Sequence, residues 1–93
     1  VGNGALYHAA ESGHADVVEL LLTYDALINQ ENRDGRTPLM AAVRAGHAQV
    51  VQMLIAGGAD ITISDFTGRT AFDLAREGRS RQVVQILEKA GAR

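Results

Sequence analysis

The chain has 93 residues, 46% hydrophobic and 22% charged, which is enough apolar content for one small soluble domain and too much for a disordered tail. Nine Lys and Arg against eleven Asp and Glu give a net charge of -2, so nucleic acid is not expected as a partner. Cysteine is absent, which excludes disulfides and thiolate catalysis and fits an intracellular protein, cytoplasmic or nuclear. Apolar runs are far shorter than the roughly 18 residues of a membrane span, so no membrane insertion is expected.

The sequence repeats with a fixed period, the spacing that carries Gly2 onto Gly35 and Gly35 onto Gly68. Shifted by this period, the first third matches the second at eleven positions, among them His14, Val18 and Leu21. The second third matches the last third in the same way. This pattern predicts a single domain of three similar units, at 1–33, 34–66 and 67–93. Because the chain begins with Val1 rather than methionine, we interpret it as a fragment of a longer protein.

The second unit shows the local structure most clearly. Thr37-Pro38 predicts a helix start, because the hydroxyl can cap free amides and proline fits the first turn. This helix is expected to run from Pro38 to Ala45 and to end at a left-handed Gly46. A second helix follows and ends at Gly57-Gly58. The glycines that close segments 30–35 and 63–68 predict a reversing turn or hairpin between units.

The outer two units depart from this pattern. The first has Gly4-Ala5 at its helix start and Asp25 at the end of its second helix, where a short polar side chain tolerates the left-handed conformation. In the third, Gly78-Arg79 predicts a turn shifted by one residue.

The third unit also carries polar residues at repeat positions that are apolar earlier in the chain. Glu88 replaces Leu22 and Ile55, and Arg76 replaces Ala10 and Val43. We interpret this polar face as a C-terminal cap, with drift inside a longer stack as the alternative. The first unit shows no comparable polar face, so its open end is expected to be the cut end of a longer stack.

Helix pairs this short cannot bury their apolar faces alone, so the units are expected to stack. The run from Asp34 to Ala42, with Gly46-His47, Val50-Val51 and the run from Gly58 to Ile61, resembles the ankyrin repeat over nearly the whole chain. The resemblance implies an all-α solenoid of three helix-turn-helix units joined by short turns or hairpins. Its predicted core consists of Leu6, Ala9, Val17, Val18, Leu21, Leu39, Val50, Val51, Leu54, Phe72, Leu74, Val83, Val84 and Leu87.

The resemblance also implies a binding surface, because ankyrin repeats bind proteins through hairpin tips and the exposed side of each first helix. Carried onto this sequence, the predicted partner-binding residues are Glu11, Ser12, Arg33, Asp34, Arg36, Arg44, Ala45, Phe66, Thr67, Arg69 and Glu77. The implied function is a protein-protein interaction module or scaffold. The alternative is a structural spacer within a longer solenoid that makes intramolecular contacts.

Two features of this surface are chemically specific. Arg36 and Arg69 lie one repeat period apart, so guanidinium groups on adjacent turns could hold an acidic or phosphorylated partner segment. Phe66 at a turn tip suits an interface anchor. The alternative for the arginines is pairing with Asp34 or Asp65 across the loops.

No catalytic, cofactor or metal site is predicted. His14 and His47 recur at one repeat position, which indicates an architectural role in tying helices and loops together. No Ser-His-Asp arrangement or metal-ligand spacing is present, so the protein is not expected to be an enzyme. Asn29 stands where some ankyrin repeats are hydroxylated. Leu27 replaces the acidic residue usual two positions earlier, which favours a structural turn role for Asn29 over hydroxylation.

Charge varies along the stack. The segment 1–31 holds five acidic side chains and no Lys or Arg, the segment 32–68 balances, and the segment 69–93 holds six basic and three acidic side chains. An acidic start and a basic end predict weak, salt-sensitive head-to-tail self-association.

Overall fold

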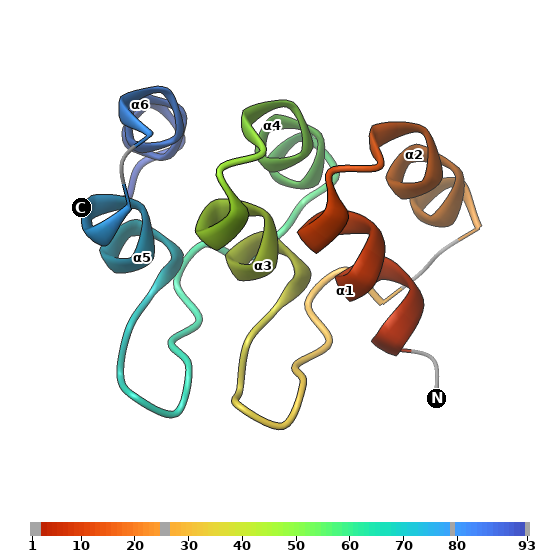
Figure 1. Ribbon diagram of the computed structural model, residues 1–93, viewed down its shortest axis with the longest axis horizontal. Coiled ribbons are helices and arrows are strands. Elements are labelled where there is room, and N and C mark those ends of the chain that lie inside the picture. Colours follow the sequence, from red (N-terminus) through yellow and green to blue (C-terminus); the bar gives the residue numbers. More distant parts are fainter. Residues whose placement is uncertain (1–2, 25–26, 79, 93) are drawn as a thin grey trace.

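The computed structural model describes residues 3–24, 27–78 and 80–92. Within these residues there are six helices and no strand, which confirms the all-α prediction: α1 (Asn3–Ser12), α2 (Ala15–Thr23), α3 (Pro38–Ala45), α4 (Ala48–Ala56), α5 (Ala71–Glu77) and α6 (Arg81–Lys89). Figure 1 shows α1, α3 and α5 in one row and α2, α4 and α6 in a second row, with the loops between units projecting on one side. No described helix is both long and apolar enough to cross a membrane.

Side-chain caps explain where α3 and α5 begin. Thr37 Oγ1 accepts a hydrogen bond from Met40 N at 3.3 Å, and α3 runs from Pro38 to Ala45 as predicted. Thr70 and Asp73 cap α5 reciprocally, each side chain accepting from the backbone amide of the other. These bonds occupy amides that the first helical turn leaves unpaired, so helices of about two turns can start at defined residues.

The end of α3 follows the predicted turn chemistry. Gly46 has φ +78°, in the left-handed region. In the third unit α5 ends at Glu77, one residue before Gly78, the repeat position of Ala45, and Gly78 is extended (φ -79°, ψ -175°) rather than left-handed. α6 begins at Arg81, the repeat position of the first residue of α4, so the end of α5 moves by one residue and the start of the next helix does not. The predictions for Asp25 and for the Arg79 half of that turn lie outside the described residues.

Each helix pair packs mainly on its sequence neighbours. α3 lies between α1 and α5, and α4 lies between α2 and α6. Ten of the fourteen predicted core residues are buried in one continuous cluster: Leu6, Ala9, Val18, Leu39, Val50, Val51, Leu54, Leu74, Val83 and Leu87.

The remaining four core predictions need correction. Val17 is 39% exposed, whereas its repeat equivalents Val50 and Val83 are 1% exposed because each faces a preceding helix pair. The other three are only half-buried: Leu21, Phe72 and Val84. They belong to the outer helix pairs, which have a neighbour on one side only among the described residues.

Of the buried residues of α3, the sequence predicted only Leu39 as part of the core. All of α3 from Pro38 to Val43 is buried, because both sides of α3 face other first helices. At the C-terminal end, Arg76 and Glu88 are exposed, which agrees with the predicted polar face.

Candidate functional site

The loops between units are built on a repeated polar turn. Asn32 Oδ1 accepts from Asp34 N at 2.9 Å and from Arg36 N at 3.0 Å. One repeat later, Asp65 Oδ1 accepts from Thr67 N at 2.8 Å and from Arg69 N at 3.1 Å. A side-chain oxygen that bonds amides two and four residues ahead holds the backbone in a turn, so the predicted hairpins are confirmed.

Asp65 also joins the two hairpins. Its side chain has no exposed area, and its Oδ2 accepts from Arg36 Nε of the preceding hairpin at 3.3 Å. Hydrogen bonds, first that from the Thr67 hydroxyl at 2.6 Å, hold the pKa of Asp65 well below its ordinary value although burial acts in the opposite direction. The carboxylate is therefore ionised at neutral pH and compensates the guanidinium of Arg36.

Phe66 lies at the tip of the second hairpin. Its amide donates to Asp34 O at 2.9 Å, and its ring lies over Gly35, where an added Cβ would come within 2.6 Å of the ring. Gly35 also has φ +76°, in the left-handed region that favours glycine. The backbone conformation and the packing of the Phe66 ring therefore both require glycine here. The Phe66 side chain remains 75% exposed. It is an aromatic side chain held in place by its neighbours and still open to solvent.

Arg69 pairs within its own unit. Its guanidinium contacts the Glu77 carboxylate and donates to Thr67 Oγ1 at 3.2 Å. The two repeated arginines are thus both matched by carboxylates, since Arg36 also lies 3.9 Å from Asp34. Arg36 thus makes the pairing with Asp34 and Asp65 that was the alternative to partner binding, whereas Arg69 pairs instead with Glu77 on α5. Arg36 is corrected from an exposed contact to a half-buried one.

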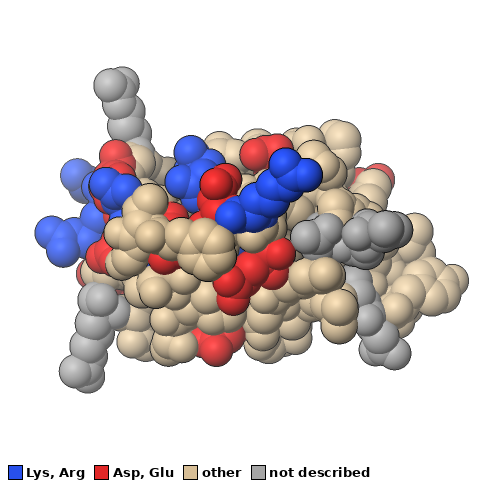
Figure 2. Space-filling view, turned by 90° about the horizontal axis from the view of Figure 1, so that it is seen from below, with Lys and Arg blue, Asp and Glu red and all other residues tan. Residues whose placement is uncertain are grey.

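The other predicted contact residues are exposed. They lie at the ends of α1, α3 and α5 and on the hairpin tips: Glu11, Ser12, Arg33, Asp34, Arg44, Ala45, Phe66, Thr67, Arg69 and Glu77. Arg33 and Arg44 form no ion pair or side-chain hydrogen bond with the described residues. In Figure 2, which views the hairpin side, Lys and Arg reach from the middle of the face to the end where α5 and α6 lie.

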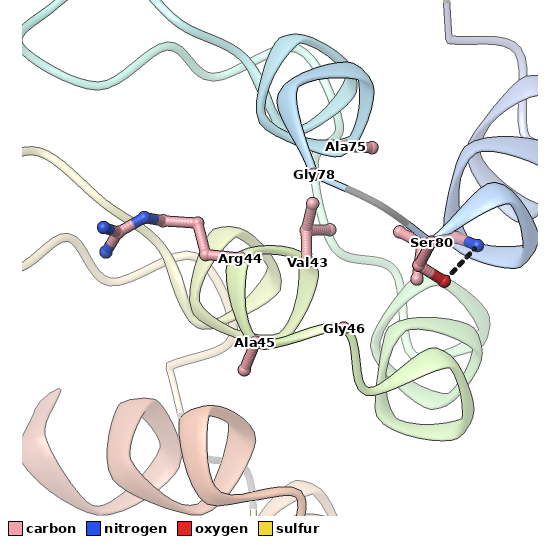
Figure 3. Close-up of a pocket in the computed structure, with 8 residues that line it drawn as sticks. Val43, Arg44, Ala45, Gly46, Ala75, Gly78 and Ser80 are labelled. Carbon is pink, nitrogen blue, oxygen red and sulfur yellow. Dashed lines mark hydrogen bonds between the residues drawn. The ribbon is translucent and has the colours of Figure 1, made fainter.

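Several hollows adjoin this surface, including one lined by Arg69, Asp73, Arg76 and Glu77. One, missed by the sequence analysis, lies between α1 and the first hairpin and is lined by Gly4, Tyr7, His8 and the hairpin residues 32–34. Another lies between the ends of α3 and α5 and is lined by the small residues Gly46, Ala75 and Ser80 among others, with Arg44 also in its lining. Figure 3 shows Arg44 extending away from this hollow, and Ser80 Oγ bonded to the start of α6, at 3.3 Å from Val83 N. The Arg44 guanidinium therefore belongs to the hairpin side.

The histidines have structural neighbours. His47 Nε2 lies 3.1 Å from Glu11 O at the end of α1, and its ring packs on Gly13. The equivalent His14 is exposed, with no side-chain hydrogen bond to the described residues. No three metal-binding side chains come together in the described part of the chain.

Asn29 links neighbouring units. Its Oδ1 accepts from Asp60 N at 2.9 Å, so its side chain ties the loop after α2 to the loop after α4. Asn29 also lies in a turn, in which Gln30 N donates to Leu27 O at 3.2 Å, and this agrees with the structural turn role that the sequence favours. Hydroxylation at this residue stays a prediction.

A family model of ankyrin repeats in three copies matches residues 6–93. No curated protein matches the chain. Ankyrin repeats are generally protein-protein interaction modules and are typically not enzymes. The match agrees with the period of the sequence, the two rows of helices and the projecting hairpins. The chain belongs to the ankyrin-repeat family.

Proposed function

We propose that this protein binds a partner polypeptide along its two hairpins and the exposed ends of α1, α3 and α5. The observation that carries the proposal is Phe66, 75% exposed at a hairpin tip and held by its backbone bond to Asp34 and its packing on Gly35. An anchor that is ordered before binding loses little conformational freedom in the complex. Exposed aromatic anchors are the residues that dominate interface energies.

Two unpaired arginines of the predicted surface support an acidic or phosphorylated partner segment. Arg33 and Arg44 are exposed and have no carboxylate partner among the described residues, unlike Arg36 and Arg69. Unpaired guanidinium groups bind carboxylates and phosphates in a bidentate way. We therefore assign the cationic contacts to Arg33 and Arg44, with Arg36 and Arg69 shaping the hairpins that present them.

The test is capture of a binding partner by the wild-type chain and by three variants, each first shown by circular dichroism to be folded. Phe66→Ala should lose the partner, and Arg33→Glu with Arg44→Glu should weaken its capture at least tenfold. Tyr24→Ala is the matched control, since Tyr24 is an aromatic residue of similar exposure, 76%, away from the hairpins.

A partner retained equally by all variants would contradict the assigned surface. A wild-type chain that captures nothing would favour the second function, a spacer within a longer solenoid.

A further inference from the structure

The exposed apolar side chains are concentrated at one end of the stack. Of the five large exposed hydrophobic residues in the described chain, four lie on α2 or just after it: Val17, Leu20, Tyr24 and Leu27. Together with Ala5 and His8 of α1, which are also exposed, we call them the N-end face. This face lies at the α1 and α2 end of the row in Figure 1, away from α5 and α6.

The repeat shows what kind of surface the N-end face is. The equivalents of Ala5, His8 and Val17 in the second unit are Pro38, Ala41 and Val50, all buried. In the third unit they are Ala71, Leu74 and Val83, also buried. Since α3 and α4 pack on the preceding pair, as do α5 and α6, these positions form the surface with which a pair receives its predecessor. The N-end face therefore has the shape to receive a helix pair of this repeat.

Acidic side chains border the N-end face, whereas the equivalent positions of the other two units are uncharged. Asp16 and Glu19 are exposed on α2, and α4 and α6 carry exposed glutamines at both equivalent positions, which are Gln49, Gln52, Gln82 and Gln85. The segment 1–31 contains no Lys or Arg. The electrostatic match for this face is a basic surface.

The opposite end of the molecule supplies such a surface. We define the C-end face as the exposed side of α5 and α6 that carries Arg76 and Arg81, together with Val84, Glu88 and Lys89. A hollow between α5 and α6 is lined by Arg76, Arg81 and Val84 among others. The segment 69–93 carries six basic and three acidic side chains.

We propose that a second copy of this chain docks its C-end face onto the N-end face, so that copies associate head to tail. The contact repeats the stacking of neighbouring units, α5 facing α1 and α6 facing α2 of the other copy. It is heterologous, so it extends into short rows of molecules. Phe66, the anchor of the proposed partner binding, belongs to neither face, so substitutions of Phe66 distinguish the two kinds of contact.

Glu88 makes the contact weak. The equivalents of Glu88 in the first two units are Leu22 and Ile55, half-buried residues that pack against the core. In the head-to-tail contact Glu88 would meet the apolar stripe that contains Leu20, and desolvation of its carboxylate is unfavourable. Association is therefore expected at high protein concentration and low salt.

The experiment is sedimentation of the full chain from about 10 μM to 1 mM, at low and at high salt. Average mass should rise with concentration at low salt and return toward the monomer at high salt. Leu20→Asp on the N-end face should give a monomer, and so should Arg76→Glu with Arg81→Glu on the C-end face. An equimolar mixture of these two variants should form a one-to-one pair that grows no further, because each keeps one intact face.

Two further variants sharpen the test. Phe66→Asp, on a hairpin and at a residue more exposed than Leu20 (75% against 55%), should leave the association unchanged. Glu88→Leu should tighten it by about tenfold, since it places on the C-end face the residue type found at Leu22. A wild-type chain that stays monomeric at the highest concentration in low salt overturns the proposal. So does a dimer that survives Arg76→Glu with Arg81→Glu, which would indicate pairing of two N-end faces.

Discussion

Asp65 and Asn32 occupy the same repeat position and close the same turn, yet they contribute differently. Asn32 bonds only backbone amides of its own loop, whereas Asp65 also binds Arg36 of the neighbouring hairpin. The negative charge turns a local turn former into a contact between units. Replacing Asp65 by asparagine isolates the contribution of the Asp65–Arg36 contact to stability. The turn itself should be kept, because the Asn32 turn shows that an amide can close the loop.

Asp65→Asn should lower the free energy of unfolding at pH 7 by about 1–3 kcal/mol, because a buried charge-assisted bond is weakened while the turn is kept. The pKa of Asp65 is lowered in the folded chain, so its stabilisation is fully present above the unfolded pKa of about 4. It is lost as the pH falls below that value toward the folded pKa. The cost of Asp65→Asn, measured by urea unfolding, should therefore be smaller at pH 2 than at pH 7. An equal cost at both pH values would contradict this account.

Gly35 and Gly68 are a matched pair for testing whether the Phe66 ring packs on Gly35. Both have positive φ, but only at Gly35 would a Cβ meet the Phe66 ring. Gly68→Ala should cost about 1–2 kcal/mol from backbone strain alone. Gly35→Ala should cost about 1 kcal/mol more, because the ring loses its packing.

In a Phe66→Ala background this difference between Gly35→Ala and Gly68→Ala should disappear, as measured by a double-mutant cycle in urea. A difference that persists would mean that the ring does not rest on Gly35 in solution.

At the scale of elements, each helix pair is joined to its neighbour by polar links as well as by the core. His47 reaches the carbonyl of Glu11 at the end of α1, and Asn29 reaches the amide of Asp60. The first link satisfies a carbonyl that a helix end leaves without an intrahelical partner. Such links fix the register of one pair on the next.

His47→Ala should destabilise the chain by about 1 kcal/mol, since it removes the bond to Glu11 and the packing on Gly13. His14→Ala is the control, because His14 is exposed at the same repeat position and has no side-chain hydrogen bond to the described residues. It should change the free energy of unfolding by less than about 0.5 kcal/mol. Thermal and urea unfolding of both variants measure the difference, and equal effects would show that the link to Glu11 contributes nothing.

At the scale of the whole molecule, place in the stack decides what a repeated residue does. Val17, Val50 and Val83 are identical in type and repeat position, but only the last two are covered by a preceding pair. Val50→Ala and Val83→Ala should each cost about 2 kcal/mol, from lost burial and a residual cavity. Val17→Ala should cost about 0.5 kcal/mol or less, because Val17 is already partly in water. If all three substitutions lower the free energy of unfolding by a similar amount in denaturant, Val17 is not at an uncovered end of the stack.

Most of the fold could be predicted from the sequence because its signals are local. Thr37-Pro38 and Gly46 bound α3 at the predicted residues, since caps and left-handed turns depend on side chains a few positions away. The fixed period of the sequence predicted the stacking, because helix pairs this short cannot bury their apolar faces alone. The candidate surface was predicted only in outline. Its exposed positions were correct except for Arg36, but which arginines were already paired was not predictable from spacing.

The sequence by itself determined the repeat, the bounds of α3, the turns between units and the polar residues Arg76 and Glu88 at the C-terminal end, because each depends on neighbours close in the chain or on the pattern of apolar residues. Only the tertiary structure decided the rest. It buried Asp65 against Arg36, placed Phe66 on Gly35 and left Val17 exposed while it covered Val50. These outcomes depend on which side chains meet across units that are far apart in the chain, and such contacts are set by packing rather than by local propensity.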